Sequence, residues 1–406
     1  MVLDEVYRFV CDVTGPLNSS GDAQGCRIED GRVITPDGFK DAWDKTWESG
    51  WRTISAPSRW GGQDAPTMLG SFVEEMFCGA NTAFTMYTGL TQSAAELILE
   101  FGTEEQKKLY VPKMMSGEWS GTMCLTEPHA GSDVGSASSG ATRNDDGTYN
   151  VEGTKIFISA GDNDLAENVI HLVLARIEGA EAGTKGLSLF IVPRIRINED
   201  GSLGELNDVA VPSIEHKMGI NASATCVVNF GDDSKCLGEV VGGIEHQGIR
   251  QMFHMMNAAR IGVGIQGLSV AAASYLSALE YARERKQGAS AKQFKDANAP
   301  RVPILQHPNI RQDLLDMKAR VEGVRALVMK LSNHADRLNA TRGKDDESEA
   351  YHKGHIDLLT PLEKAYATDP ANEVSSRARQ VHGDHGNLRD QPDEQNCRDA
   401  KNYQNY

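Results

Sequence analysis

Apolar residues recur at helical spacing through the first part of the chain. Between positions 69 and 77 they lie three or four residues apart, as on one face of a helix: Leu69, Phe72, Val73, Met76 and Phe77. Thr103 precedes two glutamates. This is the composition of a capped helix start, because a threonine hydroxyl caps free N–H groups and carboxylates favour the first turn. We therefore predict a helical domain over residues 1–119.

The pattern changes near residue 120. Short apolar or alternating runs, rich in β-branched and aromatic residues, occupy 148–159, 170–175, 186–192 and 226–230. Asp-Gly and Glu-Gly pairs between these runs supply turns. The spacing predicts a small antiparallel sheet or barrel, in a middle β domain of residues 120–242.

Helical spacing returns after residue 243. One long helix is expected over about 248–287, and a second from Pro308, because proline suits the first turn of a helix. The charged residues 341–350 are predicted to form a solvated loop before a third helix near His355. Residues 243–406 should thus form a C-terminal helical bundle. The fold class is α+β multidomain, with helical, β-barrel and helical domains in that order.

Composition excludes some functions without selecting one. The 406 residues carry a net charge of -16. An acidic surface repels phosphate backbones and argues against nucleic-acid binding. Seven scattered cysteines without a CxxC pair favour neither a disulfide framework nor a zinc ribbon, so we expect a reducing compartment and no metal. No apolar run approaches the ~20 residues of a membrane span, and the N-terminus lacks the pattern of a secretory signal.

The most specific pattern lies where the predicted β domain begins. Residues 123–135 read Met-Cys-Leu-Thr-Glu-Pro-His-Ala-Gly-Ser-Asp-Val-Gly. A strand that ends in a turn shaped by Pro and Gly exposes N–H groups and hydroxyls, which can hold carbonyl and phosphate oxygens. The run closely resembles the CxTEPxAGSD signature of the acyl-CoA dehydrogenase family.

A second segment strengthens the resemblance. Residues 153–161, Gly-Thr-Lys-Ile-Phe-Ile-Ser-Ala-Gly, are similar to that family's GxKxWIT strand. The resemblance implies FAD as cofactor, an aromatic ring beside the isoalloxazine and a hydroxyl near flavin N5. The implied cofactor-binding positions in the two segments are Met123, Leu125, Thr126, Ser132, Phe157 and Ser159. Ser132 is also implied to contact the substrate.

The long predicted helix carries two more matches. Residues 255–260 resemble the segment that contacts CoA in this family, with Asn257 and Arg260 at the contacting positions. A guanidinium can pair with a CoA phosphate, and a structural salt bridge is the alternative for Arg260. Residues 281–288 resemble YAxxRxxFG, in which the second arginine, here Arg285, reaches FAD across a dimer interface.

The last matches are incomplete. Residues 380–386 align with QxxGGxG, which implies that Gln380 and Gly383 approach the ADP half of FAD. Asp384 replaces the second glycine there and adds a negative charge near the expected pyrophosphate. This places local FAD contact in doubt, because glycine permits close approach.

The expected catalytic base is missing from the sequence. Residues 398–401, Arg-Asp-Ala-Lys, match an element that precedes IYEGT in relatives, whose glutamate abstracts the α-proton of the thioester. Counted without gaps, that glutamate would follow Tyr406. The other family position for the base is Ala259, which cannot accept a proton. No catalytic residue is therefore assigned. The subgroup typified by 3-methylmercaptopropionyl-CoA dehydrogenase extends further at both ends, so we expect a truncated chain with impaired turnover.

Together the matches imply an FAD-dependent α,β-dehydrogenation of an acyl-CoA thioester. They also imply electron-transfer flavoprotein as electron acceptor, a homodimer or homotetramer, and a cytoplasmic location (the mitochondrial matrix in a eukaryote). Two alternatives remain open. The missing base favours a non-catalytic flavin- or acyl-CoA-binding homologue, such as a partner subunit. A nucleic-acid-associated flavoprotein would need a basic patch, which the acidic balance disfavours.

Overall fold

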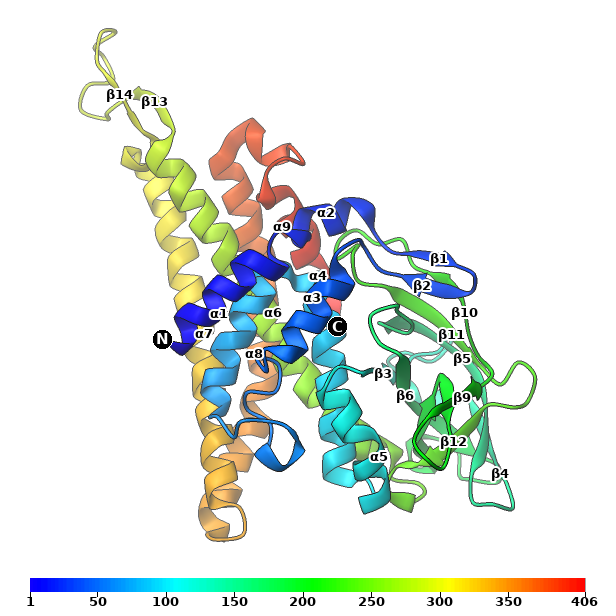
Figure 1. Ribbon diagram of the computed structural model, residues 1–406. Coiled ribbons are helices and arrows are strands. Elements are labelled where there is room, and N and C mark those ends of the chain that lie inside the picture. Colours follow the sequence, from blue (N-terminus) through cyan, green and yellow to red (C-terminus); the bar gives the residue numbers. More distant parts are fainter. Residues whose placement is uncertain (406) are drawn as a thin grey trace.

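Helices form most of the first domain in the computed structural model, which describes residues 1–405 (Figure 1). They are α1 (Val2–Phe9), a π-helical turn (Val10–Thr14), α2 (Leu17–Gln24), α3 (Phe39–Glu48), α4 (Thr67–Phe101) and α5 (Glu104–Met115). The predicted cap of α5 is confirmed. Thr103 accepts a hydrogen bond from the Gln106 amide at 3.2 Å, while the Gln106 side chain accepts one from the Thr103 amide at 3.0 Å.

A hairpin in this domain was not predicted. Strands β1 (Arg27–Glu29) and β2 (Arg32–Ile34) pair antiparallel across Asp30-Gly31. Both turn residues have positive φ, 49° and 74°. An Asp-Gly pair favours this two-residue turn, so the sequence carried the signal, although the strands themselves are very short.

The middle domain is a closed barrel, which confirms the predicted β-barrel. Its strands are β3 (Trp119–Cys124), β4 (Gly140–Arg143), β5 (Tyr149–Ser159), β6 (Asn168–Ile177), β7 (Leu187–Pro193), β10 (Val209–Ile214), β11 (Thr225–Phe230) and β12 (Leu237–Val240). A separate ribbon pairs β8 (Ile195–Ile197) with β9 (Leu203–Leu206). Closure occurs because β4 pairs with both β5 and β6, and the ring continues through β12 and β7. The ring buries an apolar interior that includes Val151, Val173 and Phe190.

The barrel is not purely antiparallel, as the sequence had suggested. Strand β6 runs parallel to both β3 and β4. These pairs are not consecutive in the chain, so the intervening segments can bring β6 back in the same direction as its neighbours. The short apolar runs located the strands but did not determine their order.

Long helices form the C-terminal domain: α6 (Gly248–Glu284), α7 (Pro308–Thr341), α8 (Asp346–His382) and α9 (Pro392–Asn402), with a small hairpin of β13 (Lys286–Ala289) and β14 (Arg301–Pro303). Figure 1 shows this hairpin projecting beyond the bundle. The start of α7 at Pro308 is as predicted. The predicted loop over 341–350 is wrong, because α8 already begins at Asp346. The Asp345 carboxylate accepts from the Ser348 amide at 3.1 Å, and acidic residues fill the first turn.

One helix within residues 1–405, α6, has the length and mean hydropathy, 1.3, of a membrane span, contrary to our reading of the sequence. Of its most apolar window, 67% is buried inside the protein. The helix packs against α4, α7 and α8, so its apolar character is explained by its place in the core of the bundle.

Candidate cofactor and substrate site

The two motifs at the start of the β domain lie side by side, although about 30 residues separate them. The Ile156 amide donates to the Thr126 carbonyl at 2.9 Å. Lys155 Nζ donates to the Leu125 carbonyl at 3.2 Å. Gly153 has φ 143°, and a Cβ there would lie 2.9 Å from the Cα of Ser139. The predicted convergence of the motifs is therefore present in the fold.

A β-bulge sets the direction of Phe157. Along the β5–β11 pair, Ile158 lies opposite Cys226 and Lys155 opposite Val228, so two residues of β5 face Val227 alone. Phe157 has φ 58°, in the left-handed region that a bulky side chain rarely adopts. The residue is 56% exposed. Bulges of this kind redirect a side chain, often beside an active site, and here an aromatic face is turned outward next to the Thr126 turn.

Glu127 fixes the turn that follows β3. Its carboxylate accepts from the Ser138 amide at 2.7 Å, the Ser138 hydroxyl at 2.9 Å and the Ser139 amide at 3.0 Å. Lys155 Nζ approaches the same carboxylate at 2.8 Å. Burial alone would raise the pKa of Glu127, but the Lys155 charge and these donors outweigh it and lower the pKa to about 2.

The remaining predicted residues of this region surround the bulge and turn. Met123 and Leu125 are half-buried and pack against the same apolar core as Met256 of α6. Thr126 is half-buried and Ser132 exposed, whereas Ser159 is buried. An exposed aromatic face beside hydroxyls and turn amides offers the contacts that a flavin ring and a phosphate require, so these residues fit FAD.

Asn257 and Arg260 form one unit on the N-terminal part of α6. Arg260 Nη1 donates to Asn257 Oδ1 at 3.0 Å, and both side chains are half-buried. Within residues 1–405 Arg260 makes no ion pair, so the salt-bridge alternative has no carboxylate partner there. Burial lowers the pKa of Lys364 on α8, and the Arg260 charge adds to this effect. These two neighbouring cations can receive an anionic ligand such as CoA.

Arg285, Gln380 and Gly383 lie apart from this group. Arg285 follows the last residue of α6, and all three are exposed, Gly383 with φ 62°. Arg260 and Arg285 are separated by 25 positions of one helix, which is roughly 38 Å at ~1.5 Å per residue. A group bound at Arg260 therefore lies far from Arg285 of the same chain.

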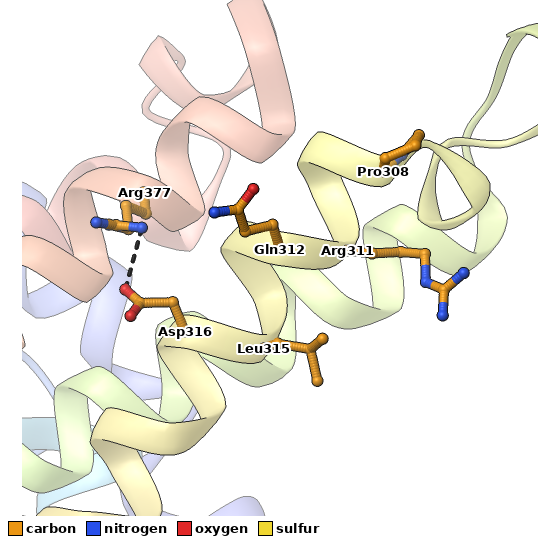
Figure 2. A pocket seen from close by; sticks show the side chains of 6 residues that line it. All are labelled: Pro308, Arg311, Gln312, Leu315, Asp316 and Arg377. Atoms are coloured by element: carbon orange, nitrogen blue, oxygen red, sulfur yellow. Dashed lines mark ion pairs between the residues drawn. The ribbon is translucent and has the colours of Figure 1, made fainter. Parts of the chain in front are cut away.

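A groove of about 650 Å³ opens at this second end of the bundle, between α7 and α8. It is lined by Pro308, Arg311, Gln312, Leu315, Asp316 and Arg377. Figure 2 shows Asp316 directed toward Arg377, with which it pairs at 3.0 Å, while Arg311 and Leu315 point outward from α7. Arg377 precedes Gln380 by about one helical turn, so the groove lies near Gln380, and none of its lining residues belongs to the two β-domain motifs.

The Arg-Asp-Ala-Lys element is built into the fold. Arg398 pairs with Asp22 at 2.6 Å, and the buried Asp399 carboxylate accepts from the Ile220 amide at 2.5 Å. Burial raises the pKa of Asp399 to about 6. Ala259, one of the two family positions for the base, lies on α6 and is half-buried. Tyr406, before the other position, lies outside the described residues.

Comparison with known proteins agrees with this arrangement. The models named acyl-CoA dehydrogenase N-terminal, middle and C-terminal domain match residues 1–118, 122–232 and 246–406. The short-chain-specific acyl-CoA dehydrogenase of Megasphaera elsdenii is 31% identical over 327 residues, covering 80% of this chain and 74% of that protein. The chain belongs to the acyl-CoA dehydrogenase family.

Further members of the family match along nearly the whole chain. The 3-methylmercaptopropionyl-CoA dehydrogenase of Ruegeria pomeroyi is 40% identical over 399 residues, or 98% of this chain. The chain spans 66% of the length of that relative. The solved butyryl-CoA dehydrogenase of Megasphaera elsdenii superposes with a TM-score of 0.79 at 26% identity, covering 100% of this chain and 92% of that structure. The acyl-CoA dehydrogenase fold is therefore shared throughout.

Sequence reasoning assigned no role to the Glu127–Lys155 pair, although both residues stand in the quoted motifs. A signal was present. Lys155 is in phase with Tyr149 and Val151, the inward-facing residues of the alternating strand. A lysine at an inward position requires a buried counter-charge, because an unpaired buried charge is very costly.

Proposed function

We propose that this chain binds FAD and an acyl-CoA thioester, and that it serves the α,β-dehydrogenation of that thioester. The observation that carries the proposal is the bulge at Phe157, which turns an aromatic ring outward directly beside the Thr126 turn. Bound FAD would supply the hydride acceptor. Thr126, Ser132 and Ser159 would hold the cofactor, Phe157 would flank its ring, and Asn257 with Arg260 would hold the CoA moiety.

The residues named above would hold and orient FAD and the thioester, whereas removal of the α-proton requires a base. Of the two family positions for the base, only Ala259 lies within residues 1–405, and a methyl group cannot accept a proton. Loss of a general base costs about 10²–10⁴-fold in rate. We therefore expect residues 1–405 to support ligand binding with slow turnover.

The proposal includes a homodimer or homotetramer. The family resemblance implies that Arg285 and Gln380 contact the cofactor of a neighbouring subunit, and both are exposed at the end of the bundle away from Arg260. Exposed apolar residues on one stripe of α8 support an oligomer: Tyr351, Leu358, Leu362 and Tyr366, which are 57%, 61%, 53% and 49% exposed. Electron-transfer flavoprotein as electron acceptor and a cytoplasmic location remain part of this proposal on the strength of the family alone.

The test is anaerobic stopped-flow reduction of the FAD-loaded 406-residue chain. The acyl-CoA panel should include butyryl-CoA and 3-methylmercaptopropionyl-CoA, after which the relatives are named. We expect ligand addition to perturb the flavin absorption spectrum and the flavin to bleach slowly afterwards. Rapid bleaching would show that another residue is the base.

A non-catalytic binding homologue is the second candidate, favoured by the methyl side chain at Ala259. It predicts a spectral perturbation with no bleaching by any acyl-CoA, even over hours. A chain that binds neither FAD nor acyl-CoA would contradict both candidates.

A further inference from the structure

The Lys155 side chain joins three separate segments in the barrel wall. Its ammonium donates to the Leu125 carbonyl at 3.2 Å, to Glu127 Oε1 at 2.8 Å and to the Leu174 carbonyl of β6 at 2.7 Å. Lysine has three N–H donors, so each of them has an acceptor. The side chains of Lys155 and Glu127 are 0% and 1% exposed. Neither can touch a ligand that binds at the surface of the barrel.

Each end of this ion pair is tied to one of the two motifs. Lys155 immediately precedes the bulge that turns Phe157 outward. Glu127 closes a turn with Ala130 through two backbone hydrogen bonds, at 2.9 and 3.1 Å, and holds Ser138 and Ser139 through its carboxylate. Ser132 lies between this closed turn and Ser138, and both ends of that segment are held by Glu127, the residue that Lys155 pairs with.

We propose that Lys155 and Glu127 are positioning residues that fix the Thr126–Ser132 turn against Phe157, and so determine where the flavin ring binds. The inference rests on the proposed function. A buried ion pair is a poor source of stability, since an apolar pair of similar volume is often as stable or more so. Fixed geometry explains the presence of the charges, because sites require partners held within about 0.5 Å by a supporting shell.

Glu127→Gln removes the charge and keeps the shape. Glu239→Gln is the matched control: Glu239 accepts from Tyr110 at 2.6 Å and Gln106 at 2.8 Å, where β12 meets α5, and contacts neither motif. Three quantities are measured for each variant: the Kd for FAD of the apoprotein, the Tm, and the visible absorption and circular dichroism of bound flavin.

We expect Glu127→Gln to weaken FAD binding by at least about tenfold, since small misplacements at a site have large effects. Its bound flavin should also show altered bands. Glu239→Gln should lower the Tm comparably while leaving the Kd within about twofold. The double variant Glu127→Gln with Lys155→Met should recover Tm without recovering FAD affinity, because it removes the uncompensated charge but not the geometric defect.

Lys155→Arg covers the case in which Glu127→Gln does not fold. It keeps the charge but spreads it over a planar fork, so it should fold, bind FAD more weakly and shift the flavin bands. Wild-type FAD affinity and spectra in Lys155→Arg, or equal behaviour of Glu127→Gln and Glu239→Gln, would overturn the inference. Failure of the wild-type chain to bind FAD would instead overturn the proposed function, and this inference with it.

Discussion

Two buried glutamates, one in the barrel and one in the helical bundle, differ in the hydrogen-bond donors around their carboxylates. Glu127 accepts hydrogen bonds from two amides, a hydroxyl and Lys155, and its pKa is lowered to about 2. Glu363 on α8 is 0% exposed, and neither of its carboxyl oxygens has a hydrogen-bond partner within the described chain. Burial raises the pKa of Glu363 to about 8.

The difference shows that a buried carboxylate keeps its charge only where donors surround it. Around Glu127 the turn and the strand supply donors, so the charge is retained and fixes the geometry of the neighbouring motifs. Glu363 lies directly against Gly264 of α6, whose missing side chain leaves the space that the carboxyl fills. No donor among residues 1–405 faces it, so it stays largely protonated at neutral pH and reduces stability when it ionises.

Removing the lysine alone should have the largest effect on stability. Lys155→Met leaves Glu127 as an uncompensated buried charge, so the free energy of unfolding should fall by about 3–5 kcal/mol. Urea unfolding measures it. The double variant Glu127→Gln with Lys155→Met should lose clearly less, and a single variant that loses under about 1 kcal/mol would contradict the strong coupling of the pair.

Neutralising the unsatisfied glutamate should stabilise the bundle, in a pH-dependent way. Burial raises the folded pKa of Glu363 to about 8, above the ordinary glutamate value of 4.5. Its contribution to stability is therefore complete below about pH 4.5, is lost as pH rises toward 8, and changes little above. Glu363→Gln should match wild type near pH 4 and exceed it by about 1–3 kcal/mol above pH 8.

The control for that variant lies on the same helix. Glu373 is exposed and pairs with Arg320 at 2.7 Å, so Glu373→Gln should change stability by less than about 0.5 kcal/mol at either pH. Equal pH profiles for Glu363→Gln and wild type would show that Glu363 has a donor in solution.

Replacing Phe157 in the bulge should raise the free energy of unfolding while weakening FAD binding. Phe157→Gly relieves a left-handed backbone that costs ~1–2 kcal/mol in a bulky residue, offset by ~0.5–1 kcal/mol of unfolded-state entropy. The net gain in unfolding free energy should be up to about 1 kcal/mol, while FAD affinity should fall because the ring face is lost. Unchanged FAD affinity would remove Phe157 from the cofactor site.

The smallest effect is expected at an exposed carboxylate. Asp384 lies on the surface after α8, where solvent screens its charge, so Asp384→Gly should tighten FAD binding by only about 0.5–1 kcal/mol. Isothermal titration at low and high salt measures this. A gain that grows with salt would contradict an electrostatic origin.

The sequence predicted most of the fold and named the segments of the site. The alternation over 148–159 and the proline at Pro308 located a strand and a helix start correctly, because both signals are local. The start of α8 was missed, since a run of charges was interpreted as a loop although Asp345 and its acidic successors form a cap. The parallel strand pairs were also missed, because pairing depends on contacts distant in sequence.

The site was predictable as motifs but not as a geometry. Phe157 and Thr126 were both identified, yet nothing local showed that Ile156 and Phe157 form a bulge, because this depends on register with Val227 on another strand. The partner of Lys155 was likewise undetermined. Its inward position demanded a counter-charge, but several carboxylates were available in the sequence.

Hydrogen exchange of the 406-residue chain with and without FAD tests most directly whether the two motifs form the cofactor site. Exchange should slow on FAD addition in peptides covering 123–139 and 153–159 together, with no change in the middle of α7. In Glu127→Gln the protection of both segments should weaken in parallel. Protection that appears elsewhere while both segments exchange as before would contradict the site proposed here.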